Sequence, residues 1–508
     1  MKQTTQKQTI SATRLIGTVL LILVLALSFL GFFAAAWYVS VYGRIGFDSI
    51  LFTLTSSLGG VDEELIAKFL TGAVLPAVLC TAAVSFLLFG RLKGKVVVKN
   101  RTVWPVPYTW AGAISLLLSI CLLVHGAFNS QLVDYVVASF SDSELYEAEY
   151  RDPETVNITF PEEKRNLIYI FLESMETSYQ DTSLGGALAY NLIPELTQLA
   201  KDNINFSHND TVGGFREISG ASWTIGAMVA HTAGVPLKVP DGIDDWQNGY
   251  GKDGVFLPGL TSLTSLLQEQ GYYQTLMVGS VASFGGRDTY YLSHGADHIY
   301  DLVTARRDGV VAYNYWNDFW GMEDLYLFEY AKQELTEISQ QDQPFAFTML
   351  TVDTHHIGGF TCALCGNDHE ESYENAIACS SKQVLEFVKW IQQQPFYENT
   401  TIVITGDHCS MDAGYFNRNV DEDYTRHVYN CFINAAAEPA YMKNRQFCAM
   451  DMFPTTLAAM GCTIEGNRLG LGTNLFSNQP TLMERMGYYA LYNELAKQSE
   501  YYAGHFYE

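Results

Sequence analysis

The stretch "TIVITGDHCSMDAG", Thr401–Gly414, changes from apolar to charged within a few residues. Its β-branched run ends at Gly406 and is followed at once by Asp407 and His408. A short apolar run that stops at a glycine is typical of a buried strand that ends at a sheet edge. The two polar side chains are therefore either part of a site at that edge, or a helix-capping Asp407 beside a core histidine.

Three other apolar runs also end in polar residues: "NLIYIFLES" (166–174), "TLMVGS" (275–280) and "FAFTMLTVDTHH" (345–356). Segments with helical spacing, such as "SSKQVLEFVKWIQQQ", separate them. This alternation predicts an α/β domain with a mainly parallel sheet between helices. Ligands of such sheets collect beyond the carboxyl ends of the strands. Glu173, Asp407 and His408 would meet there, a donor set that suits Zn²⁺, Mn²⁺ or Mg²⁺.

The first part of the chain is far more apolar than the rest. Residues 15–43, 69–89 and 110–128 are uncharged spans, each close to or longer than the ~20 residues that cross a membrane. We expect an uncleaved helical transmembrane region, 15–128, rather than a signal peptide. Residues 45–60 are apolar but interrupted by polar side chains, which favours an interfacial or re-entrant segment.

Loop charges predict the orientation of these spans. Residues 1–14 carry three basic and no acidic side chains, and the loop between the second and third spans is basic as well. Positive loops stay in the cytoplasm, so residues 1–14 form a cytoplasmic tail. A linker, 129–164, and a catalytic domain, 165–508, then lie outside. The chain is expected to be a multi-pass cell-membrane protein with an extracytoplasmic domain.

The formal net charge is −25, which argues against nucleic acid as a partner and fits a protein that holds divalent cations. Seven of the nine cysteines follow the spans. Cys362, Cys365 and Cys379 suggest a zinc knuckle, but no fourth ligand follows at a suitable spacing. An oxidising compartment favours disulfides, with at least one thiol left over. Cys409, next to His408, is explained neither by the zinc knuckle nor by the expected site at the sheet edge.

The motifs "NLIYIFLES", "TVDTHH", "TGDH" and "DMFPTTLAAMG" stand in the order found in the alkaline phosphatase/sulfatase superfamily, which residues 165–477 resemble. With membrane spans in front, the chain is most similar to lipoteichoic acid synthases and periplasmic glucan phosphoglycerol transferases. The segment "GASWTIGAMVAHTAGVPL" is closer to the glucan enzymes. The fold implied is a sulfatase-like domain behind a transmembrane region.

The resemblance implies specific site residues. Glu173, Asp407 and His408 match the metal ligands, and Thr224 matches the nucleophile that also contacts the metal. Ser222 is the alternative nucleophile, because the motif can be shifted by two residues. A hydroxyl that only caps a helix is the non-catalytic alternative for both.

Other residues match substrate contacts. His355 corresponds to a histidine that contacts the phosphate or the leaving oxygen, and its neighbour His356 could take that place. His427 matches a later histidine near the site. Arg287 and Asp288, in "SFGGRDTYYLSHG", match the loop that binds the substrate head group.

The implied activity is transfer of glycerophosphate from phosphatidylglycerol in the outer leaflet to a glycan, glycolipid or polyglycerophosphate acceptor. It would proceed through a phospho-threonine and use one divalent ion, Mn²⁺ before Mg²⁺ or Zn²⁺. The chain lacks the C/S-x-P-x-R signature of sulfatases, which argues against sulfate esters. Phosphoethanolamine transfer, phosphodiester or sulfate hydrolysis, and a catalytically inactive scaffold are the alternatives.

Overall fold

The computed structural model describes residues 12–43, 46–55, 63–90, 96–98, 101–104, 106–238, 255–315 and 321–507. The chain divides into two compact units, one made of Met1–Arg44 and Val61–Asp134, the other of Ile45–Gly60 and Tyr135–Glu508. Many of the charges that predict the orientation lie outside the described residues. These are Lys2, Lys7, Arg44, Asp62, Arg91, Lys93, Lys95 and Lys99.

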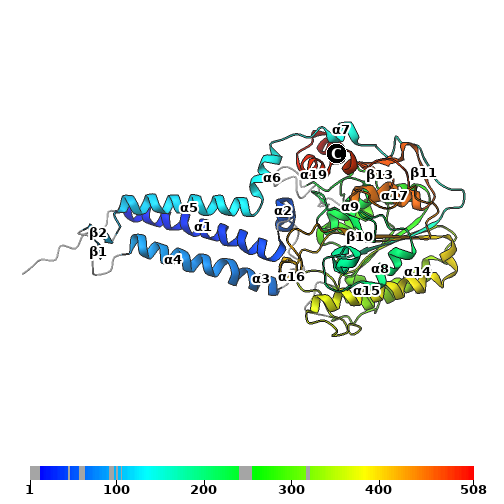
Figure 1. Cartoon of the computed structure of the whole chain (residues 1–508), viewed down its shortest axis with the longest axis horizontal. Helices are drawn as coiled ribbons and strands as arrows, with labels where there is room; N and C mark the ends of the chain where they lie inside the picture. Colours follow the sequence, from blue (N-terminus) through cyan, green and yellow to red (C-terminus); the bar gives the residue numbers. More distant parts are fainter. Residues whose placement is uncertain are drawn as a thin grey trace, which may run out of the picture. The chain divides into compact units, whose positions relative to one another are not determined.

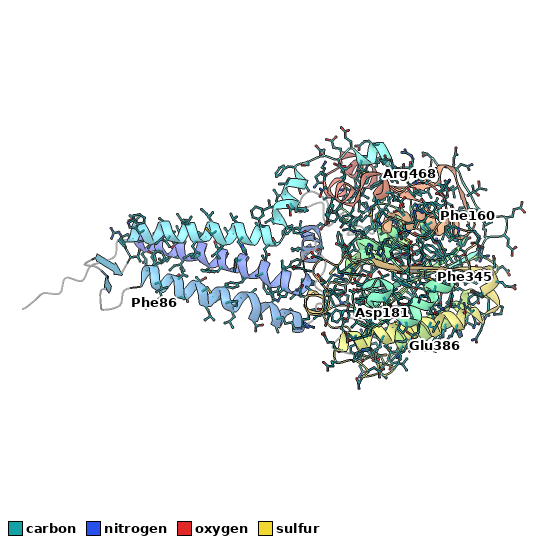
Figure 2. The ribbon with its side chains drawn as sticks, viewed as in Figure 1. Phe86, Phe160, Asp181, Phe345, Glu386 and Arg468 are labelled. Atoms are coloured by element: carbon teal, nitrogen blue, oxygen red, sulfur yellow. The ribbon has the colours of Figure 1, made fainter. Side chains whose placement is uncertain are left out.

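Three helical segments of the first unit are long and apolar enough to cross a membrane: Ala12–Tyr42, Ile66–Phe89 and Tyr108–Asn129. Large apolar side chains point away from this bundle, and Phe86 is 51% exposed (Figure 2). Exposed apolar surface of this extent is unfavourable in water, so the three helices indicate membrane anchoring. The first unit contains α1 (Ala12–Tyr42), α3 (Glu63–Phe69), η1 (Leu70–Val74), α4 (Leu75–Phe89), β1 (Val96–Val98), β2 (Arg101–Trp104) and α5 (Tyr108–Asn129).

A seven-stranded sheet forms the centre of the second unit, in the order β5-β10-β9-β4-β8-β6-β7. Its strands are β4 (Asn166–Leu172), β5 (Gly214–Phe215), β6 (Tyr273–Val278), β7 (His298–Tyr300), β8 (Phe345–Leu350), β9 (Thr400–Gly406) and β10 (Val428–Ile433). The strands from β9 to β7 are parallel, and β10 and β5 add an antiparallel edge. The predicted α/β class with a mainly parallel sheet is confirmed.

Fifteen further helices accompany this sheet within the described residues. They are α2 (Phe47–Thr55), α6 (Leu132–Ser139), α7 (Leu145–Glu149), α8 (Pro194–Asp202), α9 (Thr224–Ala233), α11 (Leu263–Glu269), α12 (Arg287–Ser293), α13 (Leu302–Arg307), α14 (Asp324–Ile338), α15 (Ser372–Gln392), α16 (Ala413–Asn419), α17 (Met452–Ala459), α18 (Leu482–Met486), α19 (Tyr488–Ala496) and α20 (Glu500–Phe506). Four short strands form two small ribbons: β3 (Ile158–Thr159) with β11 (Thr463–Ile464), and β12 (Arg468–Leu469) with β13 (Gly472–Thr473).

Two segments given separate roles above lie wholly or mostly in the second unit, which takes in residues 45–60 and the expected linker from Tyr135 onward. Helix α2 lies in the stretch expected to be interfacial or re-entrant, and the expected linker 129–164 contains α7 and β3. Because β3 pairs with β11, the end of that stretch is part of the folded unit.

Alternate residues of β4 face opposite sides of the sheet, as the period of a strand requires. Ile168, Ile170 and Leu172 join the apolar core that α8, α14 and α15 complete (Figure 1). On the other face the Tyr169 hydroxyl lies 2.9 Å from Nδ1 of His231 in α9. With helices on both faces, only the strand ends are left for a site.

His231 should make the folded domain sensitive to acid. Burial lowers the pKa of His231 to about 3, whereas an exposed histidine titrates near ~6.5. As the pH falls below ~6.5, the unfolded chain therefore binds a proton that the folded chain does not. The free energy of unfolding should drop by up to ~1.4 kcal/mol per pH unit from this group.

His231→Gln keeps an acceptor for the Tyr169 hydroxyl and removes the titrating group. Urea unfolding of the full chain in detergent, measured at neutral and at acidic pH, should show a smaller loss of stability in the variant. An identical loss in both proteins would contradict the assignment. Other buried histidines such as His294 contribute equally to both, so the difference isolates His231.

Candidate functional site

Glu173, Asp407 and His408 meet at the carboxyl edge of the sheet. Their ligand-type atoms all lie within 4.8 Å of one another, and each side chain is at most 2% exposed. Glu173 follows β4 and Asp407 follows β9, two strands that pair in parallel with Leu172 opposite Gly406. The register of this pair therefore brings the three side chains together.

The Asp407 carboxylate is satisfied on one side only. Its Oδ1 accepts hydrogen bonds from the backbone N–H groups of Ser174 (2.9 Å) and His408 (2.8 Å). Its Oδ2 is buried without a hydrogen-bond partner among the described residues and lies 3.3 Å from Nε2 of His408. Burial, reinforced by repulsion from Glu173, raises the pKa of Asp407 to about 7. A bound cation would satisfy this oxygen, which is otherwise costly to bury.

His408 presents Nε2 to both carboxylates. Its Nδ1 lies 2.9 Å from the Cys409 carbonyl, so Nδ1 donates to that carbonyl, and in the neutral ring the lone pair is on Nε2. Burial opposes protonation of His408, but Asp407 and Glu173 raise its pKa to about 9. The backbone of Cys409 thus orients the imidazole. Burial raises the pKa of the Cys409 thiol, which excludes it as a ready nucleophile.

Glu173 is held by neighbours from β4 and from the segment after β8. The Ser174 hydroxyl donates to Glu173 Oε1 (2.7 Å), and the Glu173 N–H donates to Thr351 Oγ1 (3.0 Å). Thr354 Oγ1 donates to the Glu173 carbonyl (2.5 Å). Neither threonine was predicted to contact Glu173, although both belong to the polar residues that end the run 345–356.

Thr224 is the hydroxyl that faces these ligands. It is the first residue of α9, whose N-cap is Trp223, so the Thr224 side chain does not serve as the cap. Its Oγ1 lies 3.5 Å from Glu173 Oε2 and 3.5 Å from Nε2 of His408. Ser222 lies two residues earlier, ahead of the helix. The helix amino end also favours an anion near Thr224.

Arg287 lies within electrostatic reach of the ligands. It is 1% exposed, and burial lowers its pKa to about 10 while Glu173 and Asp407 act in the opposite direction. Its Nε and Nη2 donate to the carbonyls of Phe284 and Val281. Asp288 instead accepts from the N–H of its neighbour Thr289 (2.6 Å).

The predicted histidines occupy different surroundings. His355 and His356 stack on each other, with ring centroids 4.4 Å apart, in the loop after β8. Burial lowers the pKa of His355 to about 4, and nearby His408 adds to the effect. His427 stacks instead on His208, with ring centroids 3.4 Å apart. Among the described residues, the group of possible metal ligands consists of Glu173, Asp407 and His408 and does not include His427.

The segment after His408 is fixed by residues that the sequence did not single out. Glu217 Oε1 accepts from the Cys409 N–H (2.7 Å). Glu176 accepts from the Ser410 N–H (2.9 Å) and pairs with Arg426, which also donates to the Ser410 carbonyl (2.7 Å). Some of these contacts join residues about two hundred positions apart, so no spacing rule could have revealed them.

Gly406 is required where β9 meets the site. A Cβ at this position would lie 2.0 Å from the Met175 carbonyl oxygen and 2.7 Å from a methyl of Val428. The backbones of the two strand ends therefore approach more closely than any other residue allows. This close approach places Asp407 beside Ser174.

Comparisons with known proteins agree with the motifs. The family model described as Sulfatase matches residues 239–462. The chain is 29% identical over 441 residues to "Phosphoglycerol transferase I" of Escherichia coli O6:K15:H31, covering 85% of this chain and 53% of that protein. It thus spans about half the length of the curated relatives it matches.

Two solved structures share the fold. One is a protein of the alkaline phosphatase superfamily from Vibrio parahaemolyticus, with TM-score 0.50, 21% identity, and coverage of 66% of this chain and 76% of that one. The other is the integral membrane protein lipooligosaccharide phosphoethanolamine transferase A (EptA) from Neisseria meningitidis, with TM-score 0.51, 13% identity, and coverage of 88% and 84%. The resemblance found in the motifs is confirmed as a similarity: residues 239–462 match the Sulfatase model, and the two solved structures show the same fold.

Proposed function

We propose that this chain is a membrane-anchored, metal-dependent transferase that moves glycerophosphate from phosphatidylglycerol to a hydroxyl acceptor through a phosphorylated Thr224. The observation that carries the proposal is the Thr224 hydroxyl at the start of α9, 3.5 Å from both Glu173 and His408. A relative named phosphoglycerol transferase I over most of this chain supports the choice of substrate.

The donor set fits one divalent ion. Glu173, Asp407 and His408 would hold it, and the unpartnered Oδ2 of Asp407 is the position that most needs a cation. Two carboxylates, an imidazole and a hydroxyl suit Mn²⁺ or Mg²⁺ slightly better than Zn²⁺. When bound, such an ion favours the alkoxide form of a coordinated hydroxyl and neutralises phosphate charge.

Thr224 takes part in both halves of the cycle, as the nucleophile in the first and as the leaving group in the second. Its oxygen forms a bond to the lipid phosphorus as the bond to the diacylglycerol oxygen breaks, and that oxygen gains the proton that Thr224 loses. An acceptor hydroxyl then displaces Thr224 from phosphorus, and its proton returns to Thr224. The sum is one phosphodiester exchanged for another, which predicts ping-pong kinetics.

His355 and Arg287 stabilise the phosphoryl group in this proposal. Because the pKa of His355 is lowered to about 4, its imidazole is neutral at pH 7 and acts as a hydrogen-bond donor to the phosphate or leaving oxygen. Arg287 adds a buried positive charge near the ligands. His356, Asp288 and His427 remain proposed substrate contacts at the margin of the site.

The apolar helices suit a lipid donor, since the diacylglycerol product stays in the membrane. We place the catalytic unit on the outer side, where phosphatidylglycerol of the outer leaflet and a glycan, glycolipid or polyglycerophosphate acceptor are available.

Thr224→Ala should abolish release of diacylglycerol from phosphatidylglycerol, with a loss of about a thousandfold or more, because no other hydroxyl replaces the nucleophile. Ser222→Ala is the matched control and should retain activity within about threefold. The measurement is release of labelled diacylglycerol by the full chain in mixed micelles. The opposite ranking of the two variants would move the nucleophile to Ser222.

Loss of a residue that only hydrogen-bonds to a metal ligand weakens metal binding by ~10–100-fold. Asp407→Asn replaces a proposed ligand itself, so we expect metal binding to weaken by more than this. The amide retains the shape but supplies a neutral oxygen. Manganese bound per chain is measured by mass spectrometry after chelation and re-addition, together with diacylglycerol release. Wild-type chain regains both on re-addition, and full manganese binding by Asp407→Asn would contradict the ligand assignment.

The donor is tested with labelled phosphatidylglycerol and labelled phosphatidylethanolamine in parallel. Transfer from phosphatidylglycerol is expected, with label appearing in an added glycan. Transfer from phosphatidylethanolamine alone would make the chain a phosphoethanolamine transferase, and release of free glycerophosphate with acceptor present would make it a hydrolase.

A further inference from the structure

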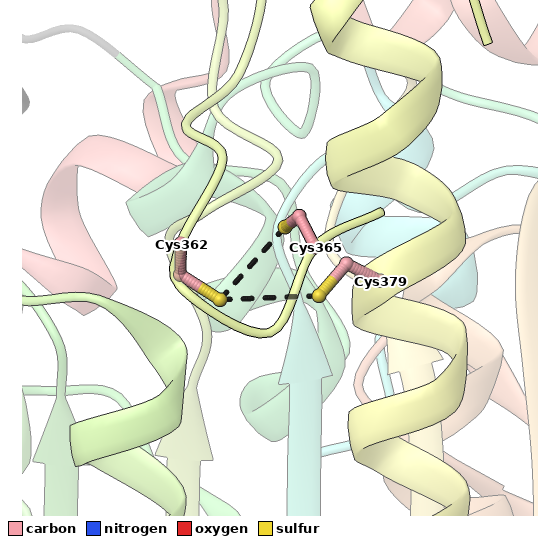
Figure 3. Close-up of side chains that lie close together, drawn as sticks. All are labelled: Cys362, Cys365 and Cys379. Carbon is pink, nitrogen blue, oxygen red and sulfur yellow. Dashed lines mark hydrogen bonds between the residues drawn. The ribbon is translucent and has the colours of Figure 1, made fainter. Parts of the chain in front are cut away.

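Three cysteine side chains converge at a position separate from the site above. Cys362 and Cys365 lie in the loop after β8, and Cys379 lies in α15, from which its side chain points toward the other two (Figure 3). The Cys362 Sγ is 3.8 Å from that of Cys365 and 3.9 Å from that of Cys379. All three sulfur atoms lie within 4.8 Å of one another.

These distances match the edge of a tetrahedral metal–thiolate site. Sulfur atoms ~2.3 Å from a zinc ion at tetrahedral angles are ~3.8 Å apart. A disulfide requires ~2.05 Å between two sulfur atoms, and it would leave the third thiol unpaired. In the structure all nine cysteines are free, in contrast to the disulfides expected from the compartment.

The loop has the local form of a metal knuckle. The Cys365 N–H donates to the Cys362 carbonyl (3.1 Å), which closes a tight turn between the two ligands. Cys362 and Cys379 are buried, and Cys365 is partly exposed. Two of the three sulfur-bearing side chains are thus buried, and the third gives an ion a path from solvent.

Within the part of the chain that the structure describes, no fourth cysteine or histidine joins the cluster, but this does not exclude an ion. Gln383, one turn after Cys379 in α15, places its amide nitrogen 3.4 Å from the Cys379 Sγ and 3.8 Å from the Cys362 Sγ. Rotation of the amide by half a turn exchanges its oxygen and nitrogen. Either this oxygen or a water reaching Cys365 can complete the tetrahedron.

The charge around the cluster also favours a cation. The sulfur atoms of Cys365 and Cys379 both lie within hydrogen-bond distance of the Cys362 sulfur. Burial, and after it the charge on Cys362, raises the pKa of Glu323, whose carboxylate accepts from the Ala363 N–H. A divalent ion would compensate these neighbouring negative groups.

We propose that Cys362, Cys365 and Cys379 bind a structural zinc ion. The ion connects α15 to the loop that begins at the end of β8 and carries His355. Backbone hydrogen bonds from Gly359 to the His355 carbonyl (3.1 Å) and from Phe360 to the Asp353 carbonyl (2.6 Å) fold this loop back toward the strand. The zinc site would hold its outer end, and would protect the three thiols from oxidation.

Zinc content of the full chain, purified in detergent without chelator, tests the proposal. Wild type, Asp407→Asn, Cys365→Ser and the control Cys462→Ser are measured by mass spectrometry of the metal. Cys462 is a buried cysteine outside the cluster. We expect one zinc equivalent in Asp407→Asn, which lacks a ligand of the proposed catalytic ion, and in Cys462→Ser. That equivalent should be absent from Cys365→Ser.

Retention of all zinc by Cys365→Ser would overturn the proposal, as would a disulfide among the three cysteines in the unreduced wild type. Should Cys365→Ser not fold, cobalt exchange into wild type provides the second test. Tetrahedral thiolate ligation gives a near-ultraviolet charge-transfer band, and its absence would overturn the zinc site. Neither result depends on transferase activity.

Discussion

The carboxylate of Asp407 is the constraint on which the rest of the site depends. Its Oδ1 binds the N–H groups of Ser174 and His408, and so joins the ends of β4 and β9 directly. That geometry leaves Oδ2 facing Nε2 of His408 in a buried space. A carboxylate held in this way is unfavourable without a cation beside it, so the backbone that completes the strand pair also shapes the place where we propose a metal ion.

The third strand of the same edge supplies a different kind of support. The segment after β8 binds Glu173 through Thr351 and Thr354 and then continues into the loop with His355. One parallel sheet thus provides the proposed ligands from two neighbouring strands and, from the third, the loop that we propose contacts the substrate. If the thiol cluster binds zinc, that loop is attached at both ends, which would limit the entropy lost when a lipid phosphate binds.

Much of this arrangement could be predicted from the sequence, because strand ends of a parallel sheet collect at one edge. Glu173, Asp407 and His408 follow from two apolar runs and the family motifs. The antiparallel β10 could not be predicted, since strand direction leaves no mark on residue pattern. Nor could the His427–His208 stack, the support of Cys409 by Glu217, or the approach of Cys379 to the "CALC" loop, because each depends on contacts across many intervening residues.

Gly406 limits which amino-acid substitutions this protein can accumulate during evolution. No side chain fits between β9 and the Met175 carbonyl, and Gly214 approaches the Val428 carbonyl just as closely on the adjoining pair of strands. Substrate loops around such a core can be exchanged, lengthened or shortened with little effect on the sheet. Gly406 cannot be replaced without moving Asp407, and Gly214 cannot be replaced without moving β5 away from β10, so we expect variation in specificity to arise in the loops.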